Sequence, residues 1–437
     1  MSQDWLASYE ALKSVYADGA YSNMALNEAI PHHHGCRDSF VRSMVKGTIR
    51  QTVTLDRIID VLARDGIKGI RTRTLIILRM GLHALREMDS VPDHAAVNEA
   101  VSLARKKARG TDKFVNALLR GYIRSRERFE AQNGELQDPA FISEIQDKYE
   151  KMSVKYGFPL PIVKLICSQY GEEAEQILKG LNTPPPVILR TNTLKTTRDE
   201  LTEALSGEGI KAEPVPEADT AIAAAGSGII ASDLYRDGLF SVQSLSSMLA
   251  VNALAPASGS RVLDMCAAPG GKSAMMAEMM EDTGSITACD IHEHRLDLIR
   301  ATAERLGINI IETKLMDGTA HDSSLDGMYD FVLADVPCSG LGVMSTKPEI
   351  RFRMDEESMA QLPEIQLEIL KNAVRYTRPG GRICYSTCTL NRSENDRVVE
   401  KLMSDEPTFG RIVEKQTVLP YNNTIGFYYC IIEKNLH

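Results

Sequence analysis

The sequence lacks any apolar run close to the roughly 20 residues that a helix needs to cross a bilayer, although 43% of its 437 residues are hydrophobic. Its first residues, MSQDWLASYEALKS, also lack the basic segment and apolar core that are typical of a signal peptide. Both absences argue against insertion into a membrane or secretion. We therefore expect a cytoplasmic protein with no membrane partner.

Cysteine is scarce, because the chain contains only eight, spread widely along its length. This is too sparse for a disulfide framework in a chain of this size, so we expect reduced thiols. Cys384 lies inside a predicted strand and is interpreted as a buried structural residue, as are Cys167, Cys289 and Cys430.

The chain also lacks a positive net charge, since its formal net charge is −9. That value disfavours nucleic acid as a partner of the whole surface. However, residues 41–130 contain 19 Lys and Arg against 10 Asp and Glu, a surplus of 9 positive charges. Such a block can bind a phosphate backbone. The alternative is a solvated helical surface with extra lysines.

Residues 1–130 are predicted to be all-helical, because apolar residues recur at helical spacing in LDRIIDVL (55–62) and LIILRMGLHAL (75–85). Residues 131–150 are polar and indicate a linker or an exposed helix. Helical spacing returns from about 151 to 182 and ends at a run of three prolines.

A small α/β unit is predicted next, with strands at 187–192 and 211–216 around a helix at 197–210. From 261 onward, buried strands alternate with amphipathic helices, which predicts a mostly parallel sheet covered on both faces. The fold class is therefore α+β and multidomain. The predicted domains are residues 1–130 (all-α), 131–235 (linker helices and a small RRM-like α/β unit) and 236–437 (an α/β sheet).

The segment RVLDMCAAPGGKS (261–273) reads as a strand, a tight turn and a helix. Gly270 and Gly271 would let the backbone approach a ligand without a Cβ in the way. The ending Gly-Lys-Ser resembles a phosphate-binding loop, but Cys266 stands where that loop needs a glycine. A dinucleotide site is also disfavoured, because the segment has no G-x-G-x-x-G.

Two acidic residues follow at the ends of the next strands. Asp290 ends SITACD about 20 residues after the glycine turn, where a carboxylate can accept both hydroxyls of a ribose. Asp317 follows the third strand region, within reach of an adenine amine. The order of turn, ribose acid and base acid favours a nucleoside cofactor without a pyrophosphate.

Two cysteines lie just past neighbouring predicted strands: Cys338 in DVPCSG, which begins with Asp335, and Cys388 in YSTCT. C5 of cytosine is a poor nucleophile until a thiolate adds to C6 and makes C5 enamine-like. The ring then takes a methyl group from a sulfonium donor, a base removes the C5 proton, and a nearby acid contacts N3 or the amine. Two cysteines and Asp335 supply what this reaction requires.

A metal site is not predicted. The two cysteines have no third or fourth ligand at suitable spacing, and the adjacent histidines His32, His33 and His34 do not fix a tetrahedral geometry. We expect the histidines to lie on an exposed loop.

The motifs resemble those of the bacterial RsmB family (also called Sun or Fmu), which methylates C5 of cytosine in 16S ribosomal RNA. The stretches that carry the resemblance are CAAPGGK (266–272), ACDIHEHR (288–295), DVPCSGLGV (335–343), PEIQLEIL (363–370) and YSTCTLNRSEN (385–395), with FSVQSLSSML (240–249) and GFYYCIIEK (426–434). Residues 91–106 and 113–120 resemble the NusB-like RNA-binding domain of that family. The resemblance therefore implies a Rossmann-like methyltransferase sheet at the C-terminus.

The resemblance also implies the cofactor and the roles of its site. S-adenosylmethionine would be bound by Cys266, Ala267, Ala268, Pro269, Gly270, Gly271, Lys272, Asp290, Arg295, Asp317 and Asp335. Cys388 would be the nucleophile and Cys338 would assist release of the product.

The partner implied is 16S ribosomal RNA before full assembly of the subunit, since a buried base is out of reach of a thiolate. DNA is not expected as a partner, and we expect a monomer. Two alternatives remain: a transfer RNA cytosine-C5 methyltransferase, and a non-catalytic RNA-binding assembly factor. The paired cysteines disfavour the second, because a domain without activity has no need of them.

Overall fold

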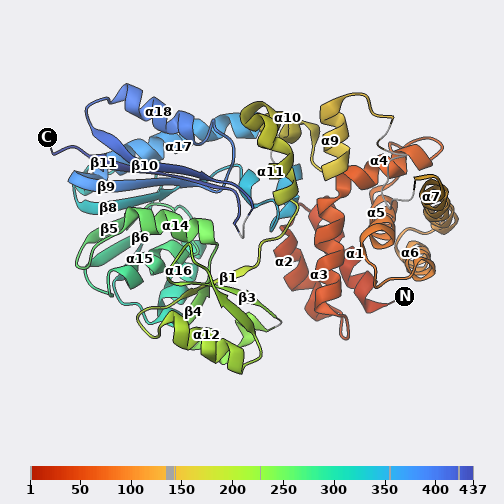
Figure 1. The fold of residues 1–437 in the computed structure, drawn as a ribbon, viewed down its shortest axis with the longest axis horizontal. Helices are drawn as coiled ribbons and strands as arrows, with labels where there is room; N and C mark the ends of the chain where they lie inside the picture. The colour runs from red at the N-terminus through yellow and green to blue at the C-terminus, as the bar shows by residue number, and fades with distance from the viewer. Residues whose placement is uncertain are drawn as a thin grey trace. The chain divides into compact units, whose positions relative to one another are not determined.

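The chain divides into two compact units in the computed structural model, which describes residues 2–133, 142, 144–226, 228–353, 356–421 and 424–436. The first unit contains residues 1–182 and 346–353, and the second contains 183–345 and 354–437. Figure 1 colours residues 1–182 from red to yellow, residues 346–353 blue, and most of the second unit from green to blue. Among the described residues, no helix is long and apolar enough to cross a membrane.

The first unit is helical, as the sequence predicts (Figure 1). Its helices are α1 (Gln3–Ala17), α2 (Ser22–His32), α3 (Asp38–Arg50), α4 (Thr52–Leu62), α5 (Thr72–Glu87), α6 (Asp93–Lys107), α7 (Asp112–Asn133), α9 (Lys148–Tyr156), α10 (Leu160–Tyr170) and α11 (Ala174–Gly180). The predicted apolar stripes of α4 and α5 enter one core, where Leu55, Ile58 and Leu82 are fully buried. Residues 134–141 and 143 of the predicted linker at 131–150 lie outside the described residues.

Residues 346–353 join this unit from far along the chain and include the short 3-10 helix η5 (Pro348–Phe352). Arg351 is 1% exposed. Its guanidinium donates to the carbonyls of Arg50 and Gly157 at 2.6 and 3.1 Å and to Oδ1 of Asn182 at 2.9 Å. Arg50 ends α3, and Gly157 and Asn182 follow the ends of α9 and α11. One arginine thus binds backbone carbonyls at the C-termini of two helices, where carbonyls have no helical partner, and a side-chain oxygen just after a third helix.

The second unit begins with a small antiparallel sheet of strand order β2-β3-β1-β4. Its elements are β1 (Val187–Thr191), α12 (Arg198–Gly207), β2 (Lys211–Pro214), β3 (Ala221–Ala225), α13 (Asp233–Arg236) and β4 (Phe240–Val242). The predicted strand–helix–strand order is confirmed. A capping box between Thr197 and Glu200 begins α12, and its face buries Leu201 and Leu205 against Leu189 of β1.

A seven-stranded sheet of order β10-β11-β9-β8-β5-β6-β7 forms the rest of the second unit. Its elements are α14 (Leu245–Leu254), β5 (Arg261–Asp264), α15 (Gly271–Met279), β6 (Ser285–Asp290), α16 (Glu293–Leu306), β7 (Ile311–Leu315), β8 (Tyr329–Asp335), α17 (Glu356–Tyr376), β9 (Thr377–Thr387), α18 (Asp396–Asp405), β10 (Gly410–Val418) and β11 (Phe427–Lys434). Five neighbouring strands, in the order β9, β8, β5, β6 and β7, are parallel to one another, as predicted. The edge strands β10 and β11 pair antiparallel to their neighbours.

Helices cover both faces of this sheet (Figure 1). Helices α14, α15 and α16 bury apolar residues against one face, and α17 and α18 against the other. The carboxyl ends of β5, β6, β7, β8 and β9 lie on one edge because these strands are parallel. Ligands of open α/β sheets bind at that edge.

Candidate active site

A pocket of about 210 Å³ lies at the carboxyl edge of the large sheet. Its lining consists of Val242, Gln243, Ser247, Asp264, Cys266, Ala267, Ala268, Pro269, Gly271, Lys272 and Asp335. Seven of these are predicted site residues. The pocket has four further lining residues that the sequence did not predict: Val242, Gln243, Ser247 and Asp264. The first three belong to the 240–249 motif, which indicated that this segment matters but not that it lines the pocket.

The glycine turn connects β5 to α15 at the floor of this pocket. Gly271 lines it, and a Cβ there would meet only the Gln243 side chain, at 3.8 Å. Gly270 has another reason to be glycine: its φ is +100°, and a Cβ would come within 3.2 Å of the Ile299 backbone. The space beside Gly271 is therefore open to the pocket, whereas Gly270 is required by its backbone conformation and by packing against α16. The amide of Ala267 donates to the Cys289 carbonyl at 2.7 Å and connects the turn to β6.

The predicted acids lie at the carboxyl ends of the second and third strands, β6 and β7. Asp290 ends β6 with its side chain 7% exposed, 3.8 Å from Arg295, and accepts a hydrogen bond from the His292 amide at 3.0 Å. Asp317 lies exposed beyond β7, and its Oδ1 accepts from the amide and hydroxyl of Thr319. Neither acid nor Arg295 is among the described residues that line the 210 Å³ pocket.

Asp264, at the end of β5, is the buried acid of the pocket and is 1% exposed. Its Oδ2 accepts from the Ser273 hydroxyl at 2.6 Å, whereas Oδ1 is buried with no hydrogen-bond partner among the described residues. Burial, aided by the charge of Asp335 and opposed by Ser273 and Lys272, raises the pKa of Asp264 to about 7. A buried oxygen without a partner, in a pocket wall, is available to hydrogen-bond a ligand, and it accepts when Asp264 is ionised.

The groups that line this pocket fit S-adenosylmethionine. The cofactor carries positive charge and several hydrogen-bond donors, and the pocket offers the free oxygen of Asp264, the carboxylate of Asp335 and a Cβ-free wall at Gly271. A pocket that offers acceptors and has no surplus of positive charge suits a cationic ligand better than it suits a phosphate ligand.

The two predicted cysteines meet at the neighbouring strand ends. The Sγ atoms of Cys338 and Cys388 are 3.1 Å apart. Asp335 of β8 pairs in register with Ser386 of β9, so that the loops after the two strands begin side by side. The amide of Gly342 also donates to the Cys388 carbonyl at 3.0 Å. A separation of 50 residues in the sequence is therefore closed to contact distance.

Lys272 brings a positive charge to this cysteine pair. Its Nζ donates to Oδ2 of Asp335 at 2.6 Å, and the Ser386 hydroxyl donates to Oδ1 at 2.7 Å. Burial opposes the ammonium charge, but the attraction of Asp335, with contributions from Asp264 and Cys388, raises the pKa of Lys272. Lys272 therefore stays charged, paired with Asp335 and interacting electrostatically with Cys388.

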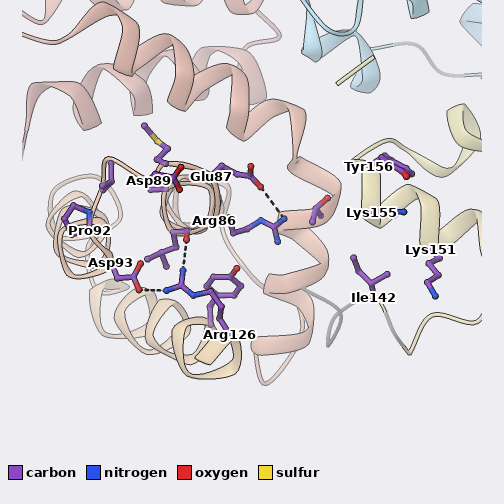
Figure 2. Close-up of a pocket in the computed structure, with 16 residues that line it drawn as sticks. Arg86, Glu87, Asp89, Pro92, Asp93, Arg126, Ile142, Lys151, Lys155 and Tyr156 are labelled. Carbon is purple, nitrogen blue, oxygen red and sulfur yellow. Dashed lines mark hydrogen bonds and ion pairs between the residues drawn. The ribbon is translucent and has the colours of Figure 1, made fainter. Parts of the chain in front are cut away.

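The helical unit contains a larger cavity of about 780 Å³, shown in Figure 2. Charges of both signs line it. Arg126 pairs with Asp93 and donates to the Leu85 carbonyl at 2.8 Å, and Lys151 and Lys155 lie across the cavity. It contains none of the predicted catalytic or cofactor residues, so we place the chemistry at the smaller pocket.

The three histidines differ in part from the predicted exposed loop. His32 is the last residue of α2, and the side chain of His33 is only 10% exposed. Its Nε2 lies 2.8 Å from Glu10 and its Nδ1 lies 3.2 Å from Gln3. His33 thus packs against α1. The part of the chain that the structure describes holds no group of three His, Cys, Asp or Glu suited to a metal ion.

Comparison with known proteins matches three family models to successive parts of the chain. They are the NusB family (residues 5–124), the ferredoxin-like domain of RsmF/B-like methyltransferases (158–228) and 16S rRNA methyltransferase RsmB/F (251–429). A protein of Bacillus subtilis named probable ribosomal RNA small subunit methyltransferase B is 33% identical, over 97% of both chains. The human 28S rRNA (cytosine(4447)-C(5))-methyltransferase is 37% identical over 52% of this chain and 29% of its own.

A solved structure also shares the fold. The crystal structure of PH0851 superposes with a TM-score of 0.81 over 99% of this chain and 98% of that one, at 23% identity. The three family models agree with the motifs in order and position, and they confirm the resemblance drawn from the sequence.

Proposed function

The chain belongs to the RsmB family of ribosomal RNA small subunit methyltransferases, and from this we propose that it methylates C5 of a cytosine in 16S ribosomal RNA, using S-adenosylmethionine. The observation that carries the proposal is the cysteine pair, with Sγ atoms 3.1 Å apart beside a pocket that suits the cofactor. Methylation of an exocyclic amine would need neither thiol.

Cys388 is the proposed nucleophile. Its sulfur forms a bond to C6 of the cytosine, which makes C5 reactive toward an electrophile. S-adenosylmethionine supplies that electrophile as a methyl group. A base then removes the C5 proton and the S–C6 bond breaks. Cys338, 3.1 Å from Cys388, can hydrogen-bond the departing sulfur and so assist release. Asp335, between Lys272 and Ser386, is proposed to contact N3 or the amine of the base.

The cofactor is proposed to be held by the glycine turn, residues 266–272, and by the acids at the strand ends. Asp290 would accept the ribose hydroxyls and Asp317 the adenine amine, with Arg295 beside Asp290. Oδ1 of Asp264, which has no hydrogen-bond partner among the described residues, is proposed as an additional contact to the cofactor that the sequence did not predict.

Each of the three predicted domains is proposed to have a separate role. We propose that residues 1–130 bind RNA, that 131–235 connect the two larger domains, and that 236–437 bind the cofactor and catalyse the reaction. The target base must be unpaired or extruded to reach a thiolate, which favours RNA that is not yet fully assembled into a subunit. We propose a cytoplasmic monomer as the acting form.

Replacing exposed Lys106, Arg109 and Lys113 together with alanine should weaken RNA binding. These residues lie at the end of α6, in the following turn and at the start of α7, within the basic block. If they contact phosphates, the slope of log affinity against log salt should flatten by about 2–3. Filter binding at several salt concentrations measures this. Lys211, Lys401 and Arg411, which are also exposed and lie in the second unit, form the control triple. Equal slopes for both triple variants would remove the helical unit from RNA binding.

The proposed reaction is tested by incubating the protein with methyl-labelled S-adenosylmethionine and either 16S ribosomal RNA or transfer RNA. We expect label in 16S RNA, and bisulfite sequencing should find 5-methylcytosine at a single position. Label only in transfer RNA would favour the alternative substrate. RNA binding without label in either would favour a non-catalytic assembly factor.

A further inference from the structure

A fully buried carboxylate lies behind the cysteine pair, outside the set of predicted site residues. Glu394, just before α18, is 0% exposed. Its Oε1 accepts from the Ser339 hydroxyl at 2.6 Å and from Nδ2 of Asn391 at 3.0 Å. Its Oε2 accepts from the Ser339 amide at 2.8 Å and from Nε2 of Gln366 at 3.1 Å. Four donors match the acceptor capacity of an ionised carboxylate.

The donors come from both cysteine loops. Ser339 directly follows Cys338, and Asn391 lies three residues after Cys388. The hydroxyls of Ser339 and Thr389, the residues after each cysteine, are also 2.7 Å apart. Gln366 of α17 adds a second contact, because its Nε2 donates to the Pro337 carbonyl at 2.9 Å. The carboxylate of Glu394 therefore connects the two loops that present the thiols.

We propose that Glu394 is a positioning residue that fixes the two cysteine loops against each other and keeps the shared proton of the pair on Cys338, leaving the negative charge on Cys388. This inference rests on the proposed function, in which Cys388 attacks the base. It assigns a role to a residue that would touch neither RNA nor cofactor.

Charge is distributed unequally around the pair. The hydrogen bond from Cys388, burial, and the negative charges of Cys388 and Glu394 raise the pKa of the Cys338 thiol well above its ordinary value. On the other side, the ammonium of Lys272 interacts with Cys388. Glu394 disfavours a negative charge on Cys338, and the ammonium of Lys272, although paired with Asp335, favours one on Cys388.

A carboxylate is required here rather than an amide. The Ser339 amide can only donate, and the amide groups of Asn391 and Gln366 both present donors to Glu394. Glutamine at position 394 would replace one carboxylate oxygen by an NH₂ group, which is a donor and would face the donors that now bind that oxygen. It would also remove the negative charge. Aspartate would keep the charge on a shorter side chain.

The test measures alkylation of the full-length protein by iodoacetamide over a pH series, without RNA, with each cysteine followed by peptide mass spectrometry. In the unmodified protein, Cys388 should react at lower pH than Cys338. In Glu394→Gln, the pH of half-maximal Cys338 alkylation should fall by about one unit, because a nearby anion is lost. Ser339→Ala is the matched control, since it removes the hydrogen bonds of the Ser339 hydroxyl to Glu394 and Thr389 and keeps the charge. Glu394→Asp should restore most of the original profile.

Two results would overturn the inference. One is an unchanged Cys338 profile in Glu394→Gln when thermal unfolding shows that this variant is folded. The other is alkylation of Cys338 at lower pH than Cys388 in the unmodified protein, a result that needs no variant at all. Both are independent of methyl transfer, so absence of RNA methylation would refute the proposed function and leave this inference to be judged by the alkylation data.

Discussion

Replacement of Cys388 by alanine is expected to abolish methyl transfer, with a rate loss on the order of 10³-fold or more, and to leave no protein–RNA adduct. Replacement of Cys338 is expected to act differently. Its thiol lies 3.1 Å from Cys388 but does not form the bond to C6 in the proposed reaction. Cys338→Ala should therefore attack and methylate but release slowly, and accumulate as an adduct that survives denaturing electrophoresis.

The measurement follows labelled RNA on a denaturing gel and methyl incorporation in parallel. Cys384→Ala is a suitable control, because this thiol is buried within β9 and donates only weakly to the Ala250 carbonyl at 3.8 Å. Adducts from Cys388→Ala with none from Cys338→Ala would reverse the assignment of the two thiols. Full activity in both variants would make the thiols structural and would end the covalent mechanism.

Glu278→Ala is expected to lower the free energy of unfolding by about 3–5 kcal/mol, since it leaves the charge of Arg190 buried without its partner. Arg190 of β1 is 1% exposed and Glu278 of α15 is 3% exposed at the side chain. The guanidinium makes two bonds to the carboxylate, at 2.8 and 2.7 Å. It also donates to the Gly271 carbonyl at 2.7 Å, so cofactor affinity should fall as well.

Chemical denaturation and calorimetry with S-adenosylmethionine measure the two effects. Burial raises the pKa of Glu278 despite the opposing attraction of Arg190, so the pair does not fully recover the cost of leaving water. The double variant Arg190→Met with Glu278→Met should therefore recover most of the lost stability. The exposed pair of Arg300 and Asp297 is the control, and Asp297→Asn should change stability by less than about 1 kcal/mol. A Glu278→Ala variant as stable as that control would contradict the prediction.

Many elements of the fold, and the sheet edge at which the candidate site is placed, could be predicted from the sequence, because both depend on local spacing. Helical periodicity in 55–62 and 75–85 became the buried faces of α4 and α5. The strand–turn–helix pattern of 261–273 became β5, the glycine turn and α15. Parallel strands end on one edge of a sheet, so residues past strand ends could be assigned to one site before any distance was known.

The tertiary structure alone decided the contacts between distant segments, because no local period encodes them. Ser339 and Glu394 are separated by 55 residues, and Arg351 and Arg50 by 301. Each of these side chains looks like an ordinary surface residue in the sequence, and only burial among fixed partners gives it a role. The same holds for the free oxygen of Asp264 and for the 3.1 Å between the two thiols. Those contacts depend on strand order and on the register of β8 with β9, which are set by packing of the whole sheet.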